Sequence, residues 1–110
     1  MIVGDLLLVM AGDPYFGPPI ARASLRGIFS VQVTNKVGAA LSLDVIVEHR
    51  NQEDTAWATA GTFPAIVGPG TFMLDVAGLK ELVRYKFQFT AGGATDGVYL
   101  FAAAPQWLRD

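Results

Sequence analysis

Two stretches of the chain alternate apolar and polar residues with a period of two, the pattern of a β-strand with one buried face. In residues 41–50 the apolar positions of one face are Leu41, Leu43, Val45 and Val47. In residues 82–90 they are Val83, Tyr85, Phe87 and Phe89. Both stretches therefore predict strands of an antiparallel sheet whose other face meets water or a partner.

Clusters of glycine and proline divide the rest of the chain into further short apolar runs, and no run has a convincing helical period. The runs include residues 2–10, 27–33, 55–63, 71–76 and 98–103, and Pro105 is expected to end the last of them. About eight short strands separated by turn signals are typical of an all-β fold. The sequence predicts an antiparallel β-sandwich or jelly roll, formed by residues 1–110 as a single domain.

The first of these runs differs from the others because Leu6 to Val9 is apolar at every position. A strand that is apolar on both faces has to be covered on both. It can lie in the centre of a sheet, or at an edge that a neighbouring subunit covers. The pattern leaves these two arrangements open.

Composition adds that the surface of the protein carries little charge. Hydrophobic residues make up 52% of the chain and charged residues 16%, compared with about 25% charged residues in ordinary soluble domains. We expect a second copy or a larger assembly to cover part of this surface. The segments expected to make the contacts are the first strand, the proline-rich loop and the C-terminal tail, through Leu6, Leu8, Tyr15, Phe16, Trp107 and Leu108.

The charge pattern argues against binding to nucleic acid. The net charge is −2, and the largest basic group, Lys80, Arg84 and Lys86, is interrupted by Glu81 and is expected to be a solvated strand face. The apolar run at residues 6–10 is too short to span a membrane. No positively charged segment precedes it, so no secretory signal is predicted. If the chain is not part of a particle, a cytoplasmic location is expected.

Few residues could support catalysis or bind a metal. The chain has no cysteine and one histidine, His49. His49 lies near Glu48, Glu53 and Asp54, which could form a metal or acid–base cluster, but the spacing is not that of metal ligands. We interpret this group as a polar strand end followed by a hairpin. The sequence predicts no catalytic residues, no metal and no cofactor. The protein is therefore expected not to be an enzyme and not to bind a small molecule.

Exposed aromatic residues offer an alternative function. Trp57, Trp107 and Tyr15 could stack against a sugar or a peptide, which would make the domain a binding module. Core packing is the favoured interpretation for Trp57, whereas a partner contact and a core position remain equally open for Trp107.

The layout from Leu41 to Trp107 resembles a known group of domains. A strand at residues 43–49 leads to a polar hairpin at residues 51–54, a strand with Trp57, a turn at Gly70 and a strand with Val83 and Arg84. This layout is similar to the small jelly-roll or galactose-binding-like domains of bacteriophage virion accessory proteins, especially head decoration proteins. The chain departs from them at residues 53–55, where Glu-Asp-Thr replaces an Asp-Gly turn, and it lacks a sugar-binding constellation.

The resemblance covers about two thirds of the chain, and it implies a structural role in a virion. The expected partners are a second copy of the chain and a capsid or shell protein. The expected location is the surface of a virion or another particle.

Overall fold

The computed structural model describes residues 2–10, 15–37, 42–67, 69–90 and 97–108, with side chains for residues 15–34, 43–67, 69–88, 100–103 and 105–108. The strands are β1 (Ile2–Met10), β2 (Tyr15–Phe16), β3 (Ile20–Ala21), β4 (Arg26–Val37), β5 (Ser42–Arg50), β6 (Ala58–Thr62), β7 (Gly70–Val76), β8 (Leu82–Thr90) and β9 (Gly97–Leu108). The predicted all-β fold is confirmed.

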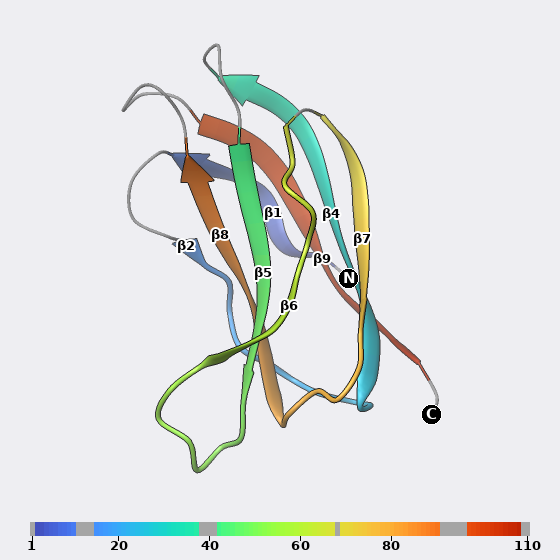
Figure 1. Ribbon diagram of the computed structural model, residues 1–110. Coiled ribbons are helices and arrows are strands. Elements are labelled where there is room, and N and C mark those ends of the chain that lie inside the picture. The colour runs from blue at the N-terminus through green and yellow to red at the C-terminus, as the bar shows by residue number, and fades with distance from the viewer. Residues whose placement is uncertain (1, 11–14, 38–41, 68, 91–96, 109–110) are drawn as a thin grey trace.

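The strands form two antiparallel sheets packed face to face (Figure 1). The first sheet has the strand order β1-β9-β4-β7, and the second has the order β2-β8-β5-β6. The short strand β3 pairs with β8 further along the edge that β2 occupies. Strand β1 pairs only with β9, so it is an edge strand of the first sheet. Among the described strands, the edge position that the sequence left open is thus the one observed, and cover by a neighbouring subunit stays a prediction.

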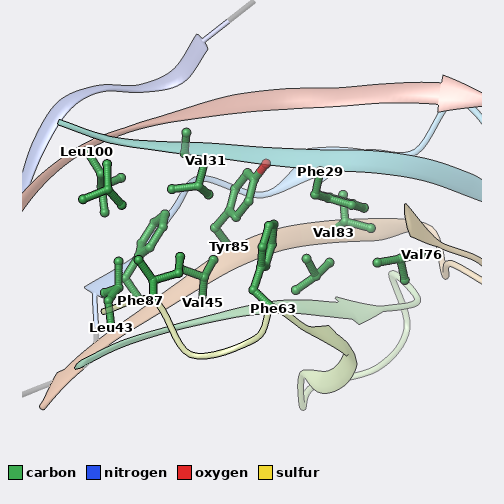
Figure 2. Packing of buried hydrophobic residues seen from close by; sticks show 14 of the residues in the cluster. Phe29, Val31, Leu43, Val45, Phe63, Val76, Val83, Tyr85, Phe87 and Leu100 are labelled. Carbon is green, nitrogen blue, oxygen red and sulfur yellow. The ribbon is translucent and has the colours of Figure 1, made fainter. Parts of the chain in front are cut away.

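The core between the sheets follows the predicted alternation. Val45 and Val47 on β5 and Val83 on β8 have no exposed surface. Figure 2 shows side chains of these strands and of neighbouring strands filling the space between the two layers. Removing each such side chain from water contributes about 1.5 to 3 kcal/mol. The apolar faces of the two sheets therefore explain why the sheets pack against each other.

Strand β9 continues past Pro105, which corrects the prediction that this proline ends the strand. Proline lacks a backbone N–H and disrupts the hydrogen-bond ladder. The pairing of β9 with β4 accordingly shifts, from Ser30 opposite Ala103 to Ile28 opposite Gln106. The strand accommodates the proline at this irregularity and pairs again as far as Leu108.

The two sheets approach each other closely where β6 lies beside β7. Gly61 on β6 faces Val76 and Leu74 on β7, and a Cβ atom at Gly61 would lie 3.0 Å from Val76 Cγ2. A side chain at this position would have to displace Val76 and Leu74, so glycine fits best where the backbone of β6 approaches them. None of the described segments forms a helix that is long and apolar enough to cross a membrane.

Candidate interaction surfaces

The outer face of the second sheet carries a cluster centred on Arg84 of β8. The Arg84 guanidinium carbon lies 4.1 Å from the centre of the Phe16 ring and 4.2 Å from that of Trp57. Arg84 Nε also donates a hydrogen bond of 2.9 Å to Glu48 Oε1 on the neighbouring strand β5. Cation–π contacts and a charge-assisted hydrogen bond therefore hold one side chain from three directions.

This cluster corrects two interpretations of the sequence. Trp57 was expected in the core, but it lies just before β6 and is half-buried on the outer face of the sheet. Arg84 was expected on a solvated face, yet its side chain is only 19% exposed. Alternation places Arg84 and Glu48 on the outer face as predicted, but it cannot reveal that Phe16 and Trp57, which are distant in the sequence, cover them.

The two guanidinium groups of the cluster, those of Arg84 and Arg50, already have partners within the protein. Arg84 forms an ion pair with Glu48, and Arg50 donates hydrogen bonds to backbone carbonyls of the following turn, including Asp54 O at 2.6 Å. The Arg50 guanidinium also lies 5.1 Å from the centre of the Trp57 ring. A sugar stacking on Trp57 would have to compete with these guanidinium groups. The geometry therefore favours a structural role for these contacts, which join neighbouring segments of the protein, over a binding site for sugars.

The neighbourhood of His49 is a strand end and a turn, as interpreted from the sequence. Glu48 belongs to the outer face, whereas His49 pairs with Val83 and has its Nδ1 atom 3.2 Å from the backbone N–H of Lys80, which donates to it. Partial burial and the nearby Lys80 charge lower the pKa of His49. Asp54 Oδ2 accepts a hydrogen bond from Asn51 N. Among the described residues, no three His, Asp or Glu side chains are grouped to hold a metal ion.

Tyr15 and Phe16 form an exposed aromatic pair on β2, at the edge of the second sheet. Tyr15 is 44% exposed and Phe16 is 42% exposed. Because the two residues are consecutive on β2, their side chains point to opposite faces of the sheet. The Tyr15 ring lies 6.2 Å from the ring of Phe87, a core residue, and the Phe16 ring lies on Arg84 of the outer face. The pair is therefore held in place while much of its surface remains open to a partner.

The outer face of the first sheet has a different character, because nearly all its described side chains are uncharged. They alternate with the buried residues of β4, β7 and β9, and they are Ile28, Ser30, Gln32, Thr71, Met73, Phe101, Ala103 and Gln106. The charged side chains described on this sheet, Arg26 and Asp75, form an ion pair near one end. By contrast, the outer face of the second sheet carries Asp44, Glu48, Arg50, Arg84 and Lys86.

A shallow hollow and a protruding side chain lie next to each other on this uncharged face. The hollow has a volume of about 290 Å³ and is lined by Ser30, Val31, Gln32, Thr71, Phe101 and Ala103. Met73, which pairs with Ser30 across the β4–β7 ladder, is 66% exposed. This surface was not predicted from the sequence. The uncharged alternate positions of residues 28–32 and 71–73 were the signal that could have revealed it.

The remaining residues predicted to contact a partner lie in two places. Leu6 and Leu8 are on the edge strand β1, and their side chains are outside the described part of the structure. Trp107 is half-buried, packs against the core and lies over Gly27. Leu108 is also half-buried, and its carbonyl accepts a hydrogen bond from the Ser24 hydroxyl. Trp107 therefore packs against the core while part of its side chain stays exposed.

Comparisons with known proteins add no relative to this picture. No family model, curated protein or solved structure matches the chain.

Proposed function

We propose that this chain is a structural, non-catalytic assembly protein that binds a larger particle and stabilises it. Following the resemblance of residues 41–107, the proposed particle is a virion. The chain would serve there as a capsid decoration protein or as another shell-associated component.

The observation that carries the proposal is that two exposed aromatic side chains, Tyr15 and Phe16, each pack on another side chain at the edge of the second sheet. Aromatic residues are enriched at protein interfaces and often dominate binding energies. An anchor that is already fixed loses little conformational entropy when a partner binds. Because Phe16 rests on Arg84 and Tyr15 near Phe87, the pair meets this requirement.

The strand order also supports the proposal. If β2 and β3 count as one interrupted strand along β8, each sheet has four strands, and the order matches that of an eight-stranded jelly roll. Jelly rolls include viral capsid domains but also lectins. A fold does not determine a function. Arg84 and Arg50 lie against Trp57, which disfavours a lectin-like sugar site and favours the assembly role.

The experiment uses particles purified from a strain in which the gene is deleted. Purified chain is added back, and the temperature at which the particles disrupt is measured. The wild-type chain is expected to co-sediment with the particles and raise this temperature. Tyr15→Ser and Phe16→Ser are each expected to weaken binding at least about tenfold, since each loses an anchor.

Leu25→Ser is the matched control, because Leu25 is similarly exposed at 48% and lies outside β2. It is expected to bind like the wild type. If wild-type chain neither co-sediments with the particles nor changes their disruption temperature, the proposal is wrong.

A further inference from the structure

We infer that the outer face of the β1-β9-β4-β7 sheet binds the same face of a second copy of the chain, with Met73 of each copy inserted into the hollow of the other. The inference rests on the proposed assembly function and names one of its partners. It uses a different surface from the Tyr15–Phe16 pair, so the two can fail separately.

The chemistry of the face fits another protein surface. Interfaces are enriched in Met and aromatic residues and depleted of Lys, Glu and Asp. Met73 and Phe101 are on this face, and the charged residues among its described side chains, Arg26 and Asp75, neutralise each other near one end. The described parts of two such faces can therefore meet without like-charge repulsion and without leaving an unpaired charge buried.

The arrangement of Met73 and the hollow favours a second copy over an unrelated partner. In a twofold dimer the same patch is used on both subunits, so a protrusion on one copy must meet a recess on the same patch of the other. Met73 and the hollow supply both parts, side by side on β7 and β4. Methionine is suited to the protruding position because its flexible side chain fills irregular gaps.

The area of the face is adequate for a dimer. Strands β4 and β9 have 12 residues each. Strand β1 has 9 residues and β7 has 7. With about 3.4 Å per residue and about 4.8 Å between strands, the four strands together cover roughly 650 Å². Stable interfaces bury about 800 Å² on each partner. The face therefore approaches the usual size, and a dimer of moderate affinity is expected.

The test measures the mass of the full chain by sedimentation equilibrium at concentrations up to about 100 µM, a range that detects moderate affinities. The wild type is expected to form dimers. Met73→Glu places a charge on the protruding side chain, and Thr71→Lys places one in the lining of the hollow. Each variant alone is expected to weaken dimerisation at least about tenfold.

The decisive experiment is sedimentation equilibrium of an equal mixture of the two variants. In a mixed dimer, the carboxylate introduced by Met73→Glu on one copy meets the ammonium group introduced by Thr71→Lys on the other. The second contact keeps the wild-type Met73 and Thr71, so mixing is expected to restore dimers. Val67→Glu is the matched control, because Val67 is 69% exposed and lies outside the sheet face, and it is expected to dimerise like the wild type.

Circular dichroism confirms that each variant remains folded. A monomeric wild type, a Met73→Glu variant that still dimerises, or a mixture that stays monomeric would each overturn the inference. If a monomeric wild type still binds and stabilises particles, the inference fails and the proposed function stands. If the wild type dimerises but leaves particles unchanged, the proposed function fails and the inferred dimer stands.

Discussion

The hydroxyl group of Tyr85, on β8 of the second sheet, accepts a hydrogen bond of 3.1 Å from the backbone N–H of Ser30, on β4 of the first sheet. The same hydroxyl donates to the carbonyl of Ala103 on β9, at 2.7 Å. These backbone groups lie where the β4–β9 pairing shifts before Pro105. A side chain of one sheet thus completes the hydrogen bonds of an irregularity in the other, and Figure 2 shows its oxygen directed toward β4.

Tyr85→Phe tests this relationship. Tyr85 is 1% exposed, so the variant leaves buried backbone groups without a partner, and its free energy of unfolding should fall by roughly 2 to 3 kcal/mol. Urea denaturation measures the change. Tyr15→Phe removes a hydroxyl from an exposed residue and should change stability by less than about 0.5 kcal/mol. Equal effects of the two substitutions would contradict the proposed role of the Tyr85 hydroxyl.

Burial also raises the pKa of Tyr85 well above its ordinary value, more than the hydrogen bond with Ser30 lowers it. Spectrophotometric titration of the folded protein should therefore show one tyrosine that resists ionisation until the fold is lost. In Tyr85→Phe this resistant signal should be absent. Its persistence in the variant would assign it to another tyrosine.

The ion pair of Arg84 and Glu48 predicts a strong coupling between these residues. Removing Arg84 alone, as Arg84→Met, leaves the Glu48 carboxylate with little solvent and should cost roughly 2 to 4 kcal/mol. The double variant Arg84→Met with Glu48→Leu removes both charges and should recover much of this loss. Chemical denaturation of the single and double variants gives the coupling energy. Additive effects would show that the pair contributes nothing beyond its separate parts.

His49 predicts that stability depends on pH. Its folded-state pKa is lowered by partial burial and then by the charge of Lys80, so the unfolded chain binds a proton more readily than the folded protein. The contribution of His49 is therefore full above its ordinary pKa, and it decreases as the pH falls through that value toward the lowered folded pKa.

His49→Asn provides the comparison for this pH dependence. Its side-chain oxygen can still accept the hydrogen bond from Lys80 N–H, but it does not titrate in this range. Unfolding measured from about pH 8 to about pH 5, the range in which histidine titrates, should show a smaller loss of stability in the variant than in the wild type. Equal losses in both proteins would exclude His49 as the cause.

Gly61 predicts a steric limit on how closely β6 and β7 can lie. A methyl group at this position would lie 3.0 Å from Val76 Cγ2 and 3.1 Å from Leu74 Cδ2, so Gly61→Ala should cost about 1 to 3 kcal/mol by overpacking. Adding Val76→Ala makes room for the methyl group. Thermal unfolding should show that the double variant loses less than the sum of the single losses. A purely additive result would mean that Val76 does not limit this position.

The sequence predicted the parts of the fold that depend on local alternation. Residues 43–47 and 83–87 are buried at every second position, because one face of each strand meets the opposite sheet. The continuation of β9 past Pro105 could not be predicted, because its hydrogen bonds are completed by Tyr85, which is distant in the sequence. Proline favours the end of a strand when only local sequence is considered. The strand can continue through it when tertiary contacts satisfy the neighbouring backbone groups.

The candidate surfaces were predictable only in part. The exposure of Tyr15 and Phe16 followed from their place in a proline-rich segment. The position of Trp57 did not, because the size of a tryptophan favours core packing, and the sequence carries no sign that it covers Arg84 on the outer face. The contact between Trp57 and Arg84 joins residues that are far apart in the sequence, which no local pattern encodes.

The central claim, that the chain is a structural component of a particle, is tested most directly by its location in the cell that produces it. Quantitative mass spectrometry across a density gradient of the lysate measures the chain and the main shell protein in each fraction. The account predicts that the chain bands with the particles at a constant ratio to the shell protein. Recovery of the chain only in the soluble fractions at the top of the gradient would contradict it.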